Sequence, residues 1–492
     1  MTEVFSHATQ FAAQFFARTI ERPNHPALVV PSADISLTFQ QLSEQVQSLA
    51  QDLSSQKIGP RHRVGIQLPN RTEFVVSLLA LSAIGAVPVL LDTSYQTQEV
   101  ETILQDSGAS GFITLQSHAK SYPELTFAAL DSQPGLGLST RETSTPNDFY
   151  EDVALMKYTS GSTGIPKGVL LTGDDIVAEG ANVAETLSIT EEDVILAAVP
   201  LFHSYGFDFC VMPMLLKGAP LILMERFLPR PAIRILQDQK VTLFPAVPFM
   251  FDLMTRVQMD GYVDFPSMRY CISAAAPLSA RTVRRFYKAF QQVICQNYGS
   301  SEAGAITLEI RRKPGVPSTC LGKSLHRVIL KILDDDGNPQ LAGEVGEVVV
   351  GGPQVSTHGY YNDPALTEAT FQNGYCYTGD LGYLDEQGNL FLSGRKKNLI
   401  NVGGKKVSPT ELEEVLREHP EVLDIAVVGV EDEVLGEVVK ACVVTANEVT
   451  VEELVSYCKE KVAGYKVPQR WAFWKELPRT RVGKLDMPRL KG

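Results

Sequence analysis

Strand-like and helical patterns alternate along the first two thirds of the chain, and this alternation restricts the fold more than any other feature. Residues 63–68 and 111–115 are short apolar runs typical of buried strands, whereas residues 97–108 between them place apolar side chains at helical spacing and end at glycine. The runs at residues 194–200 and 241–248 continue the strand pattern. Because strands that alternate with helices form parallel sheets covered by helices, the sequence predicts an α/β fold with mainly parallel sheets.

The pattern changes after about residue 325. Residues 327–352 have the pattern of two strands around an Asp-Gly turn, and residues 381–394 repeat this hairpin signal. From about Lys397 onward, a helical pattern, two apolar strand-like runs and a second helical pattern follow one another. A unit of roughly this length, about 95 residues, has the size of a small α+β domain. We therefore expect two domains, residues 1–395 and residues 396–492.

Charge and cysteine usage limit the possible partners. The chain carries 44 Lys and Arg against 57 Asp and Glu, which gives a formal net charge of −13. A protein this acidic gains no affinity from releasing the counterions of a polyanion, so nucleic acid is not an expected partner. The seven cysteines are scattered without a Cys-x-x-Cys pair. This favours buried thiols in a reducing compartment over a metal or redox site.

Two segments have the length or apolar character of an export or membrane signal. The first 23 residues lack a basic region and a continuous apolar stretch, which indicates an amphipathic helix and not a signal peptide. The longest apolar run, residues 74–92, is interrupted by Gly85 and Pro88. It therefore predicts a core helix followed by a buried strand, not a membrane span. We expect a cytoplasmic protein.

A glycine-rich stretch, residues 158–172 with the sequence YTSGSTGIPKGVLLT, separates two apolar runs. Backbone N–H groups in such a loop form a concavity for anions, because glycine lets the backbone approach closely. Lys167 adds a positive charge. The loop departs from the Walker pattern, since Pro166 replaces the glycine before the lysine and Gly168 replaces the hydroxyl residue after it. The stretch therefore predicts a phosphate-binding loop that is not that of a kinase or P-loop NTPase.

The complete string resembles the phosphate loop of the AMP-forming adenylating superfamily, which includes acyl- and aryl-CoA synthetases, non-ribosomal peptide synthetase adenylation domains and luciferase. Further segments resemble that superfamily's motifs in the same order across almost the whole chain. They are VPLFHSYGF (Val199–Phe207), SAAAPLS (Ser273–Ser279), NYGSSEAG (Asn297–Gly304), YTGDLG (Tyr377–Gly382), GRKKNLINVGGKKVSPTELE (Gly394–Glu413) and PRTRVGKLDM (Pro478–Met487). Within the superfamily, the residues around these motifs most resemble those of an acyl- or aryl-CoA synthetase.

The resemblance implies a fold and a reaction. The implied fold has a large N-terminal domain of helix-covered sheets with a distorted β-barrel-like subdomain, and a small mobile α+β C-terminal domain. The implied reaction is the attack of a carboxylate on the α-phosphorus of MgATP, which gives acyl-AMP and pyrophosphate, followed by transfer of the acyl group to a thiol. ATP, Mg²⁺ and coenzyme A are the implied co-substrates and metal.

Residues within the motifs take nucleotide-binding roles from the resemblance. Asp380 is implied to accept both ribose hydroxyls, with Arg395 reaching the same ribose, and Asn297 to bond the adenine amino group. Ser301 stands where the family usually has threonine and keeps the hydroxyl that would touch the α-phosphate. The full set implied to bind ATP or AMP is Thr159, Ser160, Gly161, Ser162, Thr163, Gly164, Lys167, Ala275, Ala276, Asn297, Tyr298, Gly299, Ser301, Asp380, Arg395 and Lys484.

Three residues are implied to be catalytic. Lys484 would bridge the substrate carboxylate and the α-phosphate, and Glu302 would give an oxygen ligand to Mg²⁺. His203 would lie beside the substrate carboxylate or the reacting acyl carbon. We do not assign His203 as a general base, because a carboxylate nucleophile already lacks its proton at pH 7.

The C-terminal motifs imply a conformational step. Lys397 corresponds to the family's hinge, about which the C-terminal domain rotates between the two half-reactions. Gly403 and Gly404 lie on the face that this rotation presents to the thiol, where glycine permits close approach of pantetheine.

The acyl substrate and the acceptor are less constrained. Tyr205, Phe207, Val247 and Ala274 are the pocket candidates, and their apolar or aromatic character favours a hydrophobic or aryl carboxylate. Asp208 invites comparison with the aspartate that holds the ammonium group in peptide-synthetase domains, but its neighbours follow the acyl-CoA synthetase pattern. Coenzyme A is the expected acceptor. The alternative is a stand-alone adenylation enzyme that loads the phosphopantetheine of a carrier protein.

Overall fold

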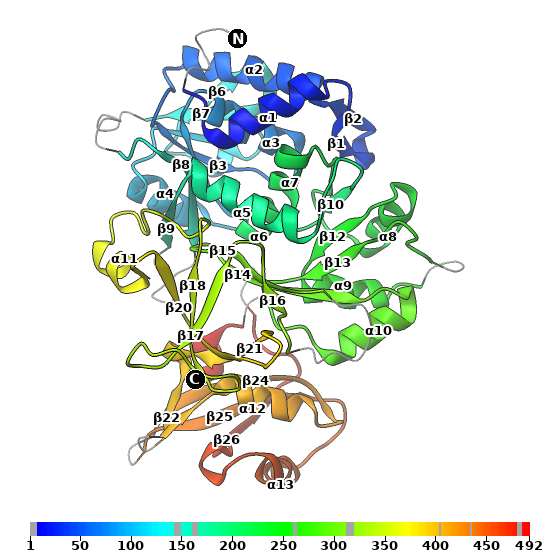
Figure 1. Ribbon diagram of the computed structural model, residues 1–492, viewed down its shortest axis with the longest axis vertical. Coiled ribbons are helices and arrows are strands. Elements are labelled where there is room, and N and C mark those ends of the chain that lie inside the picture. Colours follow the sequence, from blue (N-terminus) through cyan, green and yellow to red (C-terminus); the bar gives the residue numbers. More distant parts are fainter. Residues whose placement is uncertain are drawn as a thin grey trace. The chain divides into compact units, whose positions relative to one another are not determined.

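The computed structural model describes residues 7–141, 149–159, 166–258, 263–310, 319–402, 405–432, 435–479 and 485–492, apart from the side chains of Lys397 and Lys406 (Figure 1). It contains two compact units. The first is Met1–Leu330 with Val349–Tyr377, and the second is Lys331–Val348 with Thr378–Gly492. The domain division expected after residue 395 stays a prediction.

A nine-stranded sheet forms the larger half of the first unit, in the order β16-β15-β14-β13-β12-β10-β11-β1-β2. Strands β1 and β10 to β14 pair in parallel, and the outer strands β2, β15 and β16 pair antiparallel. The strands are β1 (Pro26–Val30), β2 (Ile35–Thr38), β10 (Ile195–Ala197), β11 (Leu221–Leu223), β12 (Leu243–Ala246), β13 (Tyr270–Ser273), β14 (Ile294–Ser300), β15 (Gly304–Glu309) and β16 (Lys323–Ser324).

A seven-stranded sheet, in the order β6-β7-β5-β3-β4-β8-β9, forms the rest of the first unit's framework. Its central strands β5, β3, β4 and β8 are parallel, and the glycine-rich stretch joins β8 to the antiparallel β9. The strands are β3 (Arg63–Gln67), β4 (Val87–Leu90), β5 (Gly111–Leu115), β6 (Ala128–Leu130), β7 (Gln133–Thr140), β8 (Val153–Thr159) and β9 (Lys167–Thr172). The expected mixed α/β fold with parallel central strands is confirmed.

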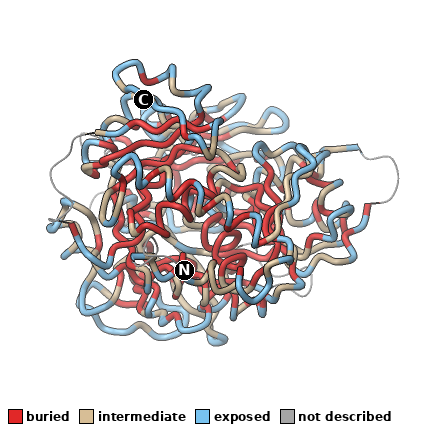
Figure 2. Tube along the Cα trace, turned by 90° about the horizontal axis from the view of Figure 1, so that it is seen from above, coloured by how far each residue is buried: buried red, intermediate tan, exposed pale blue. Residues whose placement is uncertain are grey.

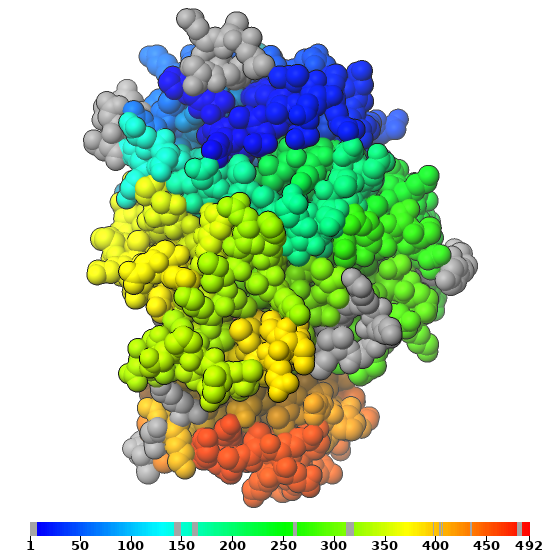
Figure 3. Space-filling model, in the orientation of Figure 1, coloured from blue at the N-terminus to red at the C-terminus, as the bar shows by residue number. Residues whose placement is uncertain are grey.

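Helices cover these sheets, and buried segments concentrate in the strands and in the helix faces that pack on them (Figure 2). The described N-terminal part of the chain, coloured blue, forms a continuous area of the first unit's surface on this face (Figure 3). The helices are α1 (Gln10–Glu21), α2 (Phe39–Ser55), α3 (Thr72–Ala83), α4 (Thr97–Asp106), α5 (Gly173–Thr186), α6 (Ser204–Gly206), α7 (Met212–Lys217), α8 (Pro229–Asp238), α9 (Pro248–Thr255), α10 (Ala280–Phe290) and α11 (Pro364–Thr370).

The longest apolar run is a buried helix, α3, followed by the buried strand β4, as predicted. Gly85 has a φ of +72°, and a Cβ there would lie 2.7 Å from the backbone oxygen of His7, so this turn requires glycine. In the part of the chain that the structure describes, no helix is both long enough and apolar enough to cross a membrane. All seven cysteines are buried and none is in a disulfide, which confirms the expectation of buried thiols, whereas the reducing compartment stays a prediction.

The remaining sheets are smaller. One has the order β17-β18-β20-β19 with β21 beside β20, and its predicted barrel-like curvature stays a prediction. The other, β23-β22-β25-β24 with β26 beside β25, packs on α12 and α13 as a compact α+β unit. The elements are β17 (Ile329–Leu333), β18 (Gly346–Gly351), β19 (Phe371–Gln372), β20 (Tyr375–Leu384), β21 (Leu390–Arg395), β22 (Ile400–Val402), β23 (Lys405–Val407), α12 (Pro409–Arg417), β24 (Val422–Asp432), β25 (Gly436–Thr445), α13 (Val451–Lys461), β26 (Arg470–Phe473) and α14 (Met487–Lys491).

Candidate active site

The glycine-rich loop is anchored by the β8–β9 hairpin. Thr159 and Lys167 are register partners at its base, and the Thr159 hydroxyl donates to the Lys167 carbonyl at 3.5 Å. Lys167 Nζ lies 3.0 Å from Asp363 Oδ2. Five residues predicted to bind phosphate lie outside the described residues, namely Ser160, Gly161, Ser162, Thr163 and Gly164.

Glu302 lies in the turn between β14 and β15 and is half-buried. Its Oε1 accepts a hydrogen bond of 2.7 Å from the Tyr360 hydroxyl, and its carbonyl accepts one of 2.9 Å from the Ser356 N–H. Burial and the Glu302 carboxylate raise the pKa of Tyr360, so its hydroxyl stays a donor near neutral pH. Sequence reasoning missed Tyr360, because nothing in its own neighbourhood indicates that it faces Glu302.

His203 lies at the start of the short helix α6, with 57% of its side chain exposed. Its Nε2 is 3.5 Å from Asp92 Oδ2. Burial alone would raise the pKa of Asp92, but the hydrogen bonds from His203 and Ser94 outweigh it and lower that pKa. Ser204 Oγ donates to Ser301 Oγ at 3.0 Å. This bond joins the His203 segment to the turn that carries Glu302.

The predicted acyl-pocket residues differ in accessibility. Tyr205 is half-buried, and its hydroxyl donates to the Ile272 carbonyl at 2.7 Å, which ties it to β13. Val247 is half-buried at the start of α9, and Ala274 is 5% exposed after β13. Phe207 is fully buried. Its ring packs edge-on against a second buried phenylalanine of α1, so it contributes to the core, and its contact with substrate stays a prediction.

The predicted adenine segment contains a strained residue. Ala275 is exposed just after β13 and has a φ of +69°, a left-handed conformation that side chains with a Cβ rarely adopt. Ala276 is also exposed and has no positive φ. The strain identifies a turn whose path is fixed by its surroundings.

This strain gives a stability prediction. Ala275→Gly removes the Cβ and is expected to change the free energy of unfolding by less than about 1 kcal/mol, because relief of strain offsets the greater entropy of the unfolded glycine. Ala275→Val is expected to lower it by more than about 1 kcal/mol, because a β-branched residue is disfavoured at positive φ. Denaturant unfolding measures both, with Ala276→Val as the control. Equal losses at the two positions would contradict the prediction.

The β14–β15 hairpin holds the other predicted adenine-side residues. Asn297 is 7% exposed, and its amide nitrogen donates to the Thr307 carbonyl at 2.9 Å. An adenine amino group would need the amide oxygen of Asn297, so this bond orients the amide without using that atom. Tyr298 is half-buried and Gly299 is exposed. A Cβ at Gly299 would lie 2.5 Å from the Gly304 carbonyl oxygen, so the close hairpin requires glycine there.

The structure contains a buried charge cluster that the sequence did not reveal, made of Lys157, Glu179 and Asp208. Lys157 of β8 lies 2.9 Å from Glu179 of α5 and 3.4 Å from Asp208, and all three side chains are at most 2% exposed. Burial raises the pKa of Glu179, and the neighbouring Asp208 carboxylate raises it further, whereas Lys157 opposes both effects. The Asp208 carboxylate is therefore buried and paired with Lys157.

The second unit holds the predicted ribose residues. Asp380 and Arg395 are register partners in strands β20 and β21, and Arg395 Nε donates to Asp380 Oδ1 at 2.6 Å. The Asp380 side chain is 7% exposed, whereas that of Arg395 is 64% exposed. The Asp380 N–H donates to Thr378 Oγ1 at 3.1 Å. The predicted pair is therefore brought together by strand pairing.

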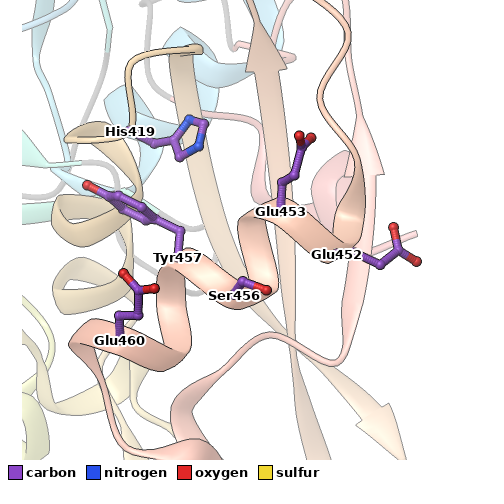
Figure 4. Close-up of a pocket in the computed structure, with 6 residues that line it drawn as sticks. All are labelled: His419, Glu452, Glu453, Ser456, Tyr457 and Glu460. Carbon is purple, nitrogen blue, oxygen red and sulfur yellow. The ribbon is translucent and has the colours of Figure 1, made fainter.

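Several predicted residues lie outside the described residues. These are Lys484, Gly403, Gly404 and the side chain of Lys397, so their predicted roles stay predictions. A surface hollow along α13 is lined by side chains of that helix and by His419, whose ring packs edge-on against Tyr457 (Figure 4). None of the residues predicted from the sequence lines this hollow.

The described residues contain no group of three or more His, Cys, Asp or Glu that could hold a metal ion. Mg²⁺ typically keeps several waters and binds through one or two carboxylates together with substrate phosphates. Glu302 fits that role, because Tyr360 bonds to its Oε1 and its side chain is not fully buried.

Comparison with known proteins agrees with this arrangement. The model of the AMP-binding enzyme family matches residues 15–361, and that of the AMP-binding enzyme C-terminal domain matches residues 411–484. The chain belongs to the AMP-binding enzyme family. It is therefore an AMP-forming acid–thiol ligase of the acyl-CoA synthetase type.

Relatives in this family match over nearly their full lengths. The chain is 33% identical to a 2-succinylbenzoate–CoA ligase of Bacillus cereus (strain Q1), over 95% of each chain. It is 31% identical to a long-chain-fatty-acid–CoA ligase of Bacillus subtilis (strain 168), over 92% of this chain and 89% of the relative. The structure of the O-succinylbenzoate coenzyme A synthetase MenE from Bacillus subtilis with ATP and magnesium has a TM-score of 0.84 and 30% identity, over 97% of this chain and 99% of that one.

Proposed function

We propose that this AMP-binding enzyme activates a hydrophobic or aryl carboxylic acid with ATP and transfers the acyl group to coenzyme A. The observation that carries the proposal is the convergence at one site region of the β8–β9 loop hairpin, the Glu302 turn and the His203 segment. The relatives named as CoA ligases for a long-chain fatty acid and for 2-succinylbenzoate support both the acid class and the acceptor.

The first step joins two anionic groups. A carboxylate oxygen forms a bond to the α-phosphorus, the bond from that phosphorus to the bridging oxygen breaks, and pyrophosphate leaves with the electron pair. Charge neutralisation and alignment are therefore the main tasks of the protein. Lys484 bridges the carboxylate and the α-phosphate, and residues 159–167 hold the leaving pyrophosphate. Glu302 would hold Mg²⁺, and the cation would neutralise phosphate charge.

Further residues orient the nucleotide and the acid. The Asp380 carboxylate accepts hydrogen bonds from the ribose hydroxyls. Arg395 orients this carboxylate through its own hydrogen bond to Asp380. His203 lies beside the acid, with its ring oriented by Asp92. Tyr205, Val247 and Ala274 give an apolar lining that favours a hydrophobic or aryl acid.

The second step transfers the acyl group. The thiol sulfur forms a bond to the acyl carbon, AMP leaves with the electrons of the broken bond, and the thiol proton is released. We propose that the C-terminal residues rotate about Lys397 before this step, which removes Lys484 and presents Gly403 and Gly404 to pantetheine. The second candidate acceptor is the phosphopantetheine of a carrier protein, which the same chemistry accommodates.

A product screen tests the proposal. The enzyme is incubated with ATP, Mg²⁺ and carboxylates of varied chain length and ring type, with and without CoA, and pyrophosphate and AMP are measured. We expect pyrophosphate release with apolar or aryl acids and faster AMP turnover when CoA is present. Release of ADP would contradict adenylation, and turnover that responds to a phosphopantetheinylated carrier protein but not to CoA would favour the second acceptor.

A further inference from the structure

The segment Ser356–Asp363 is hydrogen-bonded to strand β9 and also contacts Lys167 and Glu302. The Leu170 N–H donates to the Gly359 carbonyl at 2.9 Å, and the Tyr361 N–H donates to the Gly168 carbonyl at 2.8 Å. An antiparallel bridge between β9 and this segment lies between those bonds. The segment is thus paired to the strand that leaves the glycine-rich loop.

The same segment holds Glu302 at two points. The Ser356 N–H donates to the Glu302 carbonyl at 2.9 Å, and the Tyr360 hydroxyl donates to Glu302 Oε1 at 2.7 Å. The Ser356 hydroxyl also donates to the Leu170 carbonyl at 2.6 Å. The backbone and the carboxylate of Glu302 are therefore both fixed relative to β9.

A third contact completes the link. Asp363 Oδ2 pairs with Lys167 Nζ at 3.0 Å, while its Oδ1 accepts the Leu366 N–H at 3.0 Å and caps α11. The segment thus meets two groups assigned to the nucleotide site, the Lys167 cation at Asp363 and the Glu302 carboxylate at Tyr360. The ring of Tyr360 packs against Phe371 at 5.7 Å between centroids, which holds the hydroxyl in place.

We propose that Tyr360 is a positioning residue for magnesium binding, because its hydroxyl fixes the rotamer of the Glu302 carboxylate and leaves Oε2 for the cation. The inference rests on the proposed role of Glu302. A hydrogen-bond donor to a metal-binding carboxylate typically changes metal affinity by about 10–100-fold when removed. Tyr360 acts through Glu302 and does not itself contact the metal.

The test removes one hydroxyl. Tyr360→Phe is compared with Tyr361→Phe, which removes the hydroxyl of the neighbouring tyrosine, whose ring packs on Phe149. Mn²⁺ binding to the enzyme–ATP complex is measured by electron paramagnetic resonance, and the Mg²⁺ dependence of pyrophosphate exchange is measured in parallel. We expect Tyr360→Phe to weaken Mn²⁺ binding about 10-fold and to raise the Mg²⁺ requirement equally, and Tyr361→Phe to change neither. Unchanged binding in Tyr360→Phe, or equal losses in both variants, would overturn the proposal.

A double-mutant cycle separates this proposal from the function on which it rests. Glu302→Gln alone should weaken Mn²⁺ binding, and adding Tyr360→Phe should produce little further loss, because the hydroxyl acts through the carboxylate. Additive losses would show that Tyr360 acts elsewhere and would overturn the positioning role alone. Unchanged Mn²⁺ binding in Glu302→Gln would instead overturn the metal role of Glu302 and the inference with it.

Discussion

Lys484→Ala is expected to abolish carboxylate-dependent ATP–pyrophosphate exchange while a preformed acyl-adenylate still reacts with thiol. The lysine is assigned to the bridge between two negatively charged reactants, and that bridge is needed only before acyl-AMP exists. Loss of one such electrostatic group typically costs about 10²–10³ in rate. The two half-reactions are measured separately, by exchange of labelled pyrophosphate and by thioester formation from synthetic acyl-AMP.

The matched control is Lys491→Ala, at an exposed position at the end of helix α14. This substitution also removes a lysine from the C-terminal tail, so it reports any general effect of lost positive charge, and it should leave exchange unchanged. If Lys484→Ala retained full exchange, or if both half-reactions fell together, the assignment of Lys484 to the first step would be wrong.

Lys157→Met is expected to cause the largest loss of stability among the substitutions considered. Lys157 is the cation of a fully buried cluster with Glu179 and Asp208, and methionine leaves Asp208 without its counter-charge. Removal of one partner of a buried ion pair typically costs about 3–5 kcal/mol. Unfolding by denaturant at pH 7 measures this loss. Lys217→Met, which breaks an exposed pair of 2.6 Å with Glu185, should cost within about 1 kcal/mol.

The loss of unfolding free energy in Lys157→Met should depend on pH. Burial raises the pKa of Asp208, and Lys157 opposes that rise, so the variant's Asp208 has a higher folded pKa than the wild type. A group whose folded pKa lies above its unfolded pKa stabilises the fold below the unfolded pKa and loses that contribution as pH rises through the folded value. The deficit should therefore grow from pH 5 to pH 8. Adding Asp208→Asn should recover most of the lost stability, and a deficit independent of pH would contradict this account.

The sequence predicted the framework because its signals are local. The apolar run that becomes α3 and β4 and the alternation that becomes the parallel strands depend on residue spacing, which sequence shows directly. The two apolar runs that flank the glycine-rich stretch form the paired strands β8 and β9. The roles of individual site residues came from resemblance to a family and not from spacing.

The contacts that link distant segments could not be predicted. Tyr360 meets Glu302 across 58 positions of sequence, and Lys157 meets Asp208 across 51. Pairings of this kind depend on how the elements pack, and neither residue has a local pattern that indicates its partner. The full burial of Phe207 against α1 was likewise not indicated by its motif, and its contact with substrate stays a prediction.

Transfer of isotope from acid to nucleotide tests the central claim most directly. The enzyme is given ATP, Mg²⁺, CoA and an apolar carboxylic acid labelled with ¹⁸O in its carboxyl group, and the released AMP is examined by mass spectrometry. If a carboxylate oxygen attacks the α-phosphorus, thiolysis leaves that oxygen on the phosphate, and each AMP carries one labelled atom. Unlabelled AMP formed in step with the thioester would contradict the account.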